Sequence, residues 1–213
     1  IYELAITCPM FRVVSVGLNS ITHPTARGLY KAQDNTLIAQ AGRSYMVSVM
    51  DRATGTWDSH TTYDVYGNVA NATAMANALN ALGSDKIVVI HTWDEPQWNR
   101  LLGGLDTAMY RCGASVFIYG SAEIFKRRSA YVLAGIPGCG EGNGIELYAG
   151  DVDDDTDAWC DATIVIENGN LVLTKAQRIH LSDIPGDIDD ISDVAGIAAP
   201  NFLTSNIVAE SAI

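Results

Sequence analysis

The chain has 213 residues, of which 48% are hydrophobic and 18% charged, so it is long and apolar enough to bury a core of its own. It contains no run of about 18 apolar residues, and we therefore expect no membrane-spanning helix. The net charge of -12 repels phosphate groups and anionic lipids, which argues against nucleic-acid binding and against attachment to a membrane surface.

The first part of the chain predicts short strands rather than a helix. Residues 1–22 cluster apolar side chains as one or two strands would, with Pro9 at an edge or in a turn. Residues 23–43 are polar and predict a connection with one short strand at 36–39. Because the chain starts at Ile1 without a Met or a secretory signal, we expect a fragment of a longer protein.

The middle of the chain alternates strand and helix patterns. A tight Gly turn predicts a hairpin, and an Ala-rich amphipathic stretch follows it. Two adjacent glycines would weaken a helix, so they mark a break before a second helix. The expected elements are strands at 45–50 and 56–63, a helix at 69–82 after the N-cap Asn68 and before Gly83, a strand at 86–92, and a helix at 105–112 after Gly103 and Gly104.

The remaining elements predict more sheet. Strands are expected at 115–119, 131–135, 145–149, 162–167 and 171–174, the last two joined by the hairpin signal Asn168-Gly169. The fold class is α/β in the α+β sense, a mixed β-sheet with two packed helices, additional strands and an extended C-terminal oligomerisation segment. We divide the chain into N-terminal strands (1–41), a main domain (42–175) and an acidic linker with the oligomerisation segment (176–213).

The C-terminal segment carries a narrow apolar stripe. Its members are Ile184, Ile188, Ile191, Val194 and Ile197. A stripe this narrow does not fold alone, so it either docks on its own domain or self-associates about a symmetry axis.

Acidic residues are concentrated in the C-terminal third. The segment from Glu146 to Asp193 contains thirteen acidic residues and two basic residues. The run Asp151–Asp157 resembles the start of a calcium loop, but Thr156 stands where the loop needs Gly and Ala162 where it needs Glu. A solvated acidic loop is the expectation, with a looser oxygen-ligand site as the alternative. We predict neither a metal site nor a cofactor, since the glycine-rich 138–144 segment lacks the Lys-Ser/Thr pair of a phosphate loop.

No catalytic dyad is visible. His91 ends an apolar strand, but no Ser or Cys nucleophile and no HExxH motif accompanies it. A glycosidase would need a carboxylate pair, for which Glu95, Glu141 and Glu146 are the candidates outside the Asp cluster. We expect no catalytic residue and no enzyme activity.

Four aromatic residues are candidates for contact with a partner: Trp57, Tyr66, Trp93 and Trp98. Trp93 and Trp98 are favoured because they follow a strand. The competing interpretation is that most of the four pack in the core or the hairpin.

Four cysteines match no zinc pattern. Cys139 and Cys160 flank one hairpin-like segment and are the candidate pair for a possible disulfide. Buried free thiols are the favoured interpretation, because sequence does not fix how closely the two approach.

The stretch from about residue 42 to residue 168 resembles the interleukin-like EMT inducer family, also called the GG domain. Six pieces carry the resemblance in order: DRATG between strands, YDVYGN, a helix ending in NALG, SDKIVVIHTWDE, a helix ending in YRCGAS, and SAYVLAGIPG. The tail PNFLTSNIVAESAI is similar to segments that follow such domains in the central tail fibre, or tip attachment protein, of lambda-like siphophages.

This resemblance implies a mixed sheet with two helices, no catalytic apparatus, and a role at the tail tip of a virion. The implied partners are two further copies in a homotrimer, other tail-tip proteins, and a bacterial outer-surface receptor of protein or polysaccharide. A secreted cytokine-like or carbohydrate-binding module is the alternative. The secreted members of this family contain disulfides, and Cys139 and Cys160 are the only pair in this sequence that could correspond to one of them.

Overall fold

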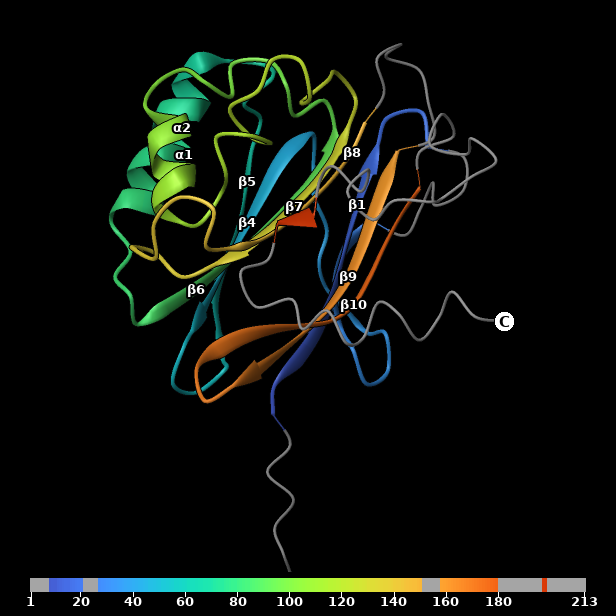
Figure 1. Cartoon of the computed structure of the whole chain (residues 1–213), viewed down its shortest axis with the longest axis vertical. Helices are drawn as coiled ribbons and strands as arrows, with labels where there is room; N and C mark the ends of the chain where they lie inside the picture. The colour runs from blue at the N-terminus through green and yellow to red at the C-terminus, as the bar shows by residue number, and fades with distance from the viewer. Residues whose placement is uncertain (1–7, 21–26, 151–157, 180–196, 199–213) are drawn as a thin grey trace, which may run out of the picture.

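A computed structural model describes residues 8–20, 27–150, 158–179 and 197–198 (Figure 1). The elements are β1 (Met10–Gly17), β2 (Gly28–Lys31), β3 (Leu37–Ala39), β4 (Ser44–Asp51), β5 (Trp57–Tyr63), α1 (Val69–Asn80), β6 (Lys86–Asp94), α2 (Leu105–Arg111), β7 (Ala130–Gly135), β8 (Ile145–Ala149), β9 (Trp159–Glu167), β10 (Asn170–Ile179) and β11 (Ile197–Ala198). They form the predicted α+β fold, in which two helices pack on a mixed sheet. Neither helix is long and apolar enough to cross a membrane, within the described residues.

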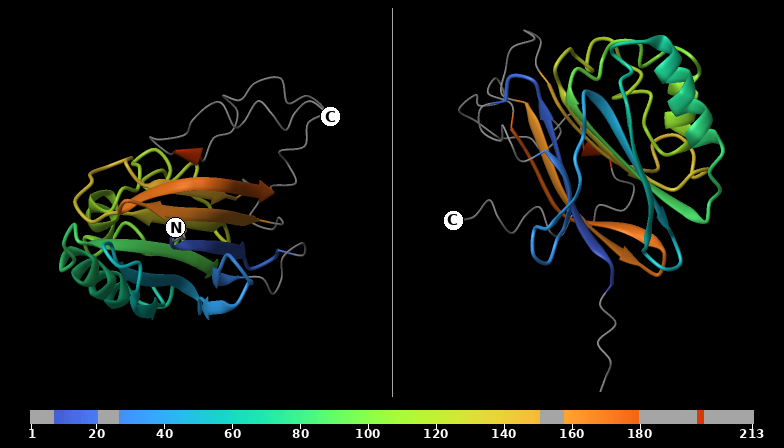
Figure 2. Two further views of the ribbon diagram at one scale, coloured as in Figure 1. Left: turned by 90° about the horizontal axis from the view of Figure 1, so that it is seen from below. Right: turned by 180° about the vertical axis from the view of Figure 1, so that it is seen from behind.

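The sheet divides into two halves that meet at β1 and β6 (Figure 2). One edge of β1 pairs with β9, while the other pairs first with β2 and then, in parallel, with the end of β6. β6 in turn lies between β4 and β7. Strands β1 to β3, which precede residue 42, therefore belong to the same sheet as the strands that follow it.

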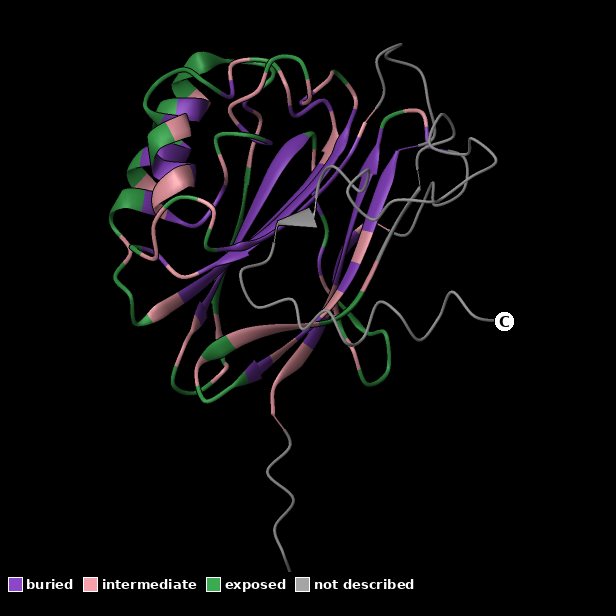
Figure 3. Cartoon of the chain, in the orientation of Figure 1, coloured by how far each residue is buried: buried purple, intermediate pink, exposed green. Residues whose placement is uncertain are grey.

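Alternate residues of a strand point to opposite faces of the sheet, so β6 contributes to two separate cores. Figure 3 shows that the central strands are largely buried. Val88 and Ile90 of β6 pack in the core beneath the helices. Ile87 and Val89 pack in the core between the two halves of the sheet. Because both faces of β6 are covered, its residues from Ile87 to Thr92 are buried, and the run Ile87–Ile90 is apolar, as the sequence indicated.

Both helices begin where the sequence predicts. The side chain of Asn68 caps α1 by accepting a hydrogen bond from the amide of Ala70 at 2.8 Å. Gly103 and Gly104 have positive φ angles of 64° and 76°, and α2 starts directly after them. Gly83 does not end α1 as expected, since the C-cap is Ala81, two residues earlier.

The Asn168-Gly169 turn is confirmed, with positive φ angles at both residues, as a two-residue hairpin between β9 and β10 requires. The strand expected at 115–119 is wrong, because this segment forms turns. Side-chain oxygens accept its amides: Glu146 that of Ser115, and Glu141 that of Val116. Because these amides bond to side chains, they do not form the backbone hydrogen bonds of a β-sheet.

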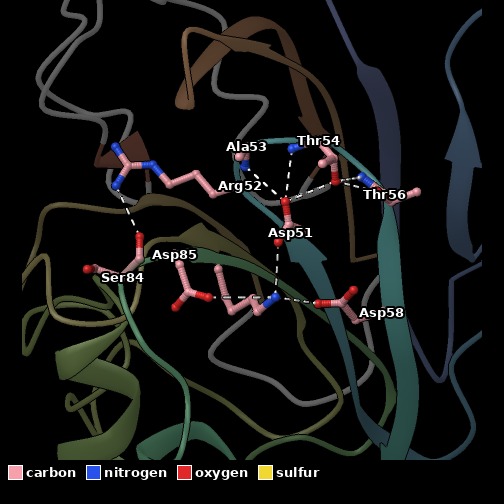
Figure 4. Close-up of polar contacts among 9 residues, drawn as sticks. Asp51, Arg52, Ala53, Thr54, Thr56, Asp58, Ser84 and Asp85 are labelled. Carbon is pink, nitrogen blue, oxygen red and sulfur yellow. Dashed lines mark hydrogen bonds and ion pairs between the residues drawn. The ribbon is translucent and has the colours of Figure 1, made fainter.

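An ion-pair cluster fixes the turns at the start of β6 (Figure 4). The ammonium group of Lys86 lies 3.2 Å from Asp51, 3.0 Å from Asp58 and 3.7 Å from Asp85. Beside it, Arg52 donates to backbone carbonyls of the α1–β6 loop and of the β9–β10 turn. Hydrogen bonds from Thr54, together with Lys86, lower the pKa of Asp51 to about 2. This end of the sheet is polar, and its charges hold three loops together.

Candidate binding surface

Most of the exposed large apolar side chains lie on three segments that follow β5, β6 and α2. Among the described residues nine such side chains are exposed, and seven lie on three segments: 65–69, 97–102 and 115–121. We call these seven the apolar loop surface: Tyr66, Val69, Trp98, Leu101, Leu102, Val116 and Phe117. Trp98 and Phe117 expose 61% and 62% of their area. Concentrations of this kind mark interaction sites in soluble proteins.

The first two segments are joined by the side chain of Asn99. Its amide donates to the carbonyl of Val65 at 2.9 Å and to that of Tyr66 at 3.3 Å. Asn99 itself has a φ of 62°, in the left-handed region that Asn tolerates better than most residues. The turn that carries Trp98 is thereby fixed beside the segment that carries Tyr66.

Arg100 joins the second segment to the third. Its guanidinium is buried, donates to the carbonyls of Tyr119 at 3.0 Å and Ser121 at 2.8 Å, and lies 4.8 Å from the centre of the Phe125 ring. The hydroxyl of Tyr119 donates back to the carbonyl of Arg100 at 3.2 Å. A desolvated cation held by carbonyls and a ring fixes the two turns firmly.

Glu146 anchors the start of the third segment from the sheet. It is fully buried on β8, where it accepts from the amide of Ser115 at 2.9 Å and from the hydroxyl of Tyr131 at 2.7 Å. Burial raises the pKa of Glu146 to about 7, with a further contribution from the charge of Glu141. Glu146 therefore holds Ser115, the first residue of the third segment, against β8.

Two of the four predicted aromatic contact residues lie on this surface, Trp98 and Tyr66. Beside Tyr66 the guanidinium of Arg43 stands 4.9 Å from the ring centre and forms an ion pair with Asp64 at 2.6 Å. The loop position of Trp98, directly after a buried strand, was the useful sequence signal.

The structure places the other two aromatic residues in packing roles. Trp93 packs against the core between the sheet halves, with Arg27 stacked on its ring at 3.6 Å. Trp57 packs edge-on against Phe11 at 5.5 Å. It starts β5, whose seven residues span about 20 Å, and Tyr66 follows the opposite end of that strand. The packing interpretation therefore holds for Trp57 and Trp93.

Sequence reasoning missed the aliphatic part of the surface. Leu101 and Leu102 stand just before the Gly103-Gly104 break, and Val116 with Phe117 looked like part of a strand. Two adjacent apolar residues beside a glycine break were the available signal. The turns at 115–119 are held by Glu146 and Glu141, which come later in the chain, so no local pattern reveals them.

The three candidate carboxylates each accept backbone amides. Glu95 accepts from Gln97 at 2.8 Å and from Arg128 at 3.1 Å, and Glu141 accepts from Val116 at 3.1 Å. Burial raises the pKa of Glu95. Each of these contacts, like those of Glu146, braces a loop.

His91 lies inside the sheet rather than at an accessible edge. It is fully buried between Met46 and Val132 of the neighbouring strands, and neither ring nitrogen has a hydrogen-bond partner among the described residues. Desolvation lowers its pKa to about 3, so the ring is neutral at physiological pH.

Cys139 and Cys160, the candidate pair for a disulfide, are not bonded to each other. The thiol of Cys160 faces the carbonyl of Ala130 at the start of β7, whereas Cys139 follows the end of that strand. The six residues of β7 span about 17–20 Å, and a disulfide requires Cα atoms within about 7 Å. The four cysteines of the chain are thiols.

The Asp151–Asp157 run and most of the C-terminal stripe lie outside the described residues. Within the described part of the chain, no three His, Cys, Asp or Glu side chains are grouped to hold a metal. No family model matches the sequence, and no curated protein matches it.

Proposed function

We propose that this chain is a non-catalytic recognition domain of a phage tail-tip fibre and that it attaches the virion to a bacterial outer-surface receptor. The observation that carries the proposal is the apolar loop surface, where Trp98 and six other exposed apolar side chains lie on three segments that are joined by hydrogen bonds. Exposing so much apolar area costs solubility, and a partner that covers it removes that cost. The resemblance to tail-fibre segments supports the setting.

The proposal includes assembly as a homotrimer at the distal end of the tail, beside other tail-tip proteins. Its support is the apolar stripe that starts at Ile184, which needs a partner and whose small and β-branched residues suit packing about an axis. Light scattering on the full chain tests this part. A strictly monomeric particle at micromolar concentration contradicts it.

Adsorption competition tests the recognition role. The purified full chain should slow adsorption of the phage that encodes it, and the chain carrying Trp98→Ala should slow it much less. Leu37→Ser is the matched control, since Leu37 is exposed on β3 outside the apolar loop surface. If the folded, assembled chain leaves adsorption unchanged, the domain is a spacer and does not bind the receptor.

A further inference from the structure

We propose that the edge of β8 that faces away from β7 is a strand-binding site, and that the C-terminal segment around Ile197 and Ala198 of the same chain occupies it. This role goes beyond the proposed function and stands without it, because it concerns contacts within one domain. Of the two alternatives for the apolar stripe, docking on the chain's own domain therefore applies to its last member, Ile197.

β8 is buried as a central strand would be. Its five residues, Ile145–Ala149, each expose at most 5% of their area. Ile145 and Leu147 pack in the core between the two halves of the sheet, and Tyr148 packs in the core beneath the helices. β7 pairs with one edge of the strand. Because both faces of β8 are covered, the amides and carbonyls of its second edge also need hydrogen-bond partners.

The edge strand β5 shows how an open edge looks in this fold. It pairs with β4 alone among the described strands, and residues 58–62 are exposed. Its sequence WDSHTTY is polar, so water can hydrogen-bond to its free edge. β8 reads IELYA and has a single acidic or basic residue, Glu146, which is buried. An apolar edge left open would pair with other chains, so we expect a strand to cover it.

β11 covers this edge in the described part of the tail (Figure 1). It runs antiparallel to β8, with Ile197 opposite Leu147 and Ala198 opposite Glu146. It is the last strand on the path through the sheet, after β7 and β8. The main chain of the tail therefore supplies the partners that the second edge of β8 needs.

The sequence after β11 fits the length of β8. Continued in the same register, Pro200 would stand opposite Gly144, the residue directly before β8 begins. Proline has no amide hydrogen and therefore ends a ladder of this kind. The tail thus carries its stop signal at the position where β8 has no further residues to pair.

The connection to β11 favours the chain's own strand over that of a second copy. β8 and β10 both contribute to the core between the two halves of the sheet, through Leu147 and Leu173 among others, and facing sheets lie about 10 Å apart. Residues 180–196, which connect β10 to β11, can extend to about 55 Å and so reach this edge easily. A strand tethered to its own domain has an effective concentration on the order of millimolar, far above that of the same strand in another copy.

Disulfide trapping in the full chain tests the site. Leu147→Cys with Ile197→Cys places two thiols at directly opposed positions, whose Cβ atoms lie about 4.5–5.5 Å apart in an antiparallel pair. Leu147→Cys with Ala198→Cys is the matched control, because successive residues of a strand point to opposite faces. After oxidation with glutathione disulfide, we expect at least about tenfold more bonded chain in the first variant than in the control. The bonded product should run as a single chain on a non-reducing gel, and mass spectrometry of its peptides identifies the bond.

Other results overturn the inference in distinguishable ways. A bond that joins two chains would assign β11 to a neighbouring copy and overturn docking within one domain. Equal yields in the two variants would overturn the site itself. Both results leave the proposed recognition function standing, since adsorption competition tests that function with the wild-type chain.

Hydrogen exchange gives a second readout that needs no added cysteine. Ile197→Pro with Ala198→Pro removes both amides of β11 and should undock it, so the β8 amides that do not bond to β7 should exchange at least about tenfold faster. Ile207→Pro with Val208→Pro is the matched control near the end of the chain and should change this exchange less than about twofold. Equal acceleration in the two variants, or none in either, would contradict the docking of β11.

Discussion

Arg100 and Tyr119 hold each other by two hydrogen bonds that run in opposite directions: the guanidinium donates to the Tyr119 carbonyl at 3.0 Å, and the phenol donates to the Arg100 carbonyl at 3.2 Å. Both residues are buried, yet the turns they join carry the most exposed apolar side chains of the described chain. The order of the apolar loop surface therefore depends on two residues that are not themselves exposed.

Arg100→Met should lower the free energy of unfolding by about 2–4 kcal/mol, because buried carbonyls lose a charged donor. Urea denaturation measures this loss, and hydrogen exchange of the 115–121 amides should accelerate. Arg52→Met is the matched control, since Arg52 also donates to carbonyls but is only partly buried, and its loss should stay below about 1 kcal/mol. Equal losses in the two variants would contradict the bracing role.

Glu146 should make the protein less stable as the pH rises from about 4.5 to about 7. Its pKa is about 7 in the folded chain and 4.5 as a free side chain, so the folded state holds the proton more tightly. The stabilisation is complete below pH 4.5 and is lost by pH 7, which amounts to about 3 kcal/mol. Glu146→Gln should remove this pH dependence in urea titrations, whereas the exposed Glu141→Gln should keep it.

His91 changes the pH dependence of stability in the opposite direction. Its pKa is about 3 when folded and 6.5 as a free side chain, so stability is present above pH 6.5 and is lost as the pH falls toward 3. His91→Leu should abolish this acid loss and raise stability at pH 7 by about 1 kcal/mol, because a buried unpartnered polar ring is removed. His60→Leu is the control at an exposed histidine. An unaltered acid transition in His91→Leu would contradict the assignment.

Thiol titration checks the cysteines. The denatured, unreduced chain should yield four thiols per molecule with a chromogenic disulfide reagent. In the native chain Cys112 should react slowest, since it is buried and its pKa is raised to about 12 by desolvation. Cys139→Ser should remove one thiol without changing thermal stability by more than a few degrees. A yield of two thiols would point to a bond that the structure lacks.

Local signals predicted the elements that are determined locally. Asn68, the Gly103-Gly104 pair and the Asn168-Gly169 turn each encode a cap, a break or a hairpin within a few residues. The same reasoning failed for 115–119, where two glutamates from later in the chain decide the outcome. It also could not separate Trp98 from Trp93, since both follow the strand expected at 86–92, whereas in the structure Trp93 belongs to β6 and packs against the core between the sheet halves.

The position of β1 has a consequence for how the chain folds. Met10 pairs with Val165 and Val16 with Trp159, so β1 pairs with residues that lie about 150 positions later in the sequence. Such distant pairing slows folding, because loop closure precedes any gain from contact. During synthesis both helices are complete before β9 is made. Until then β1 lacks its β9 partner, and the core between the two halves of the sheet lacks the residues that β9 contributes. We expect refolding in the millisecond-to-second range or slower, with the nascent chain dependent on chaperones until β9 emerges.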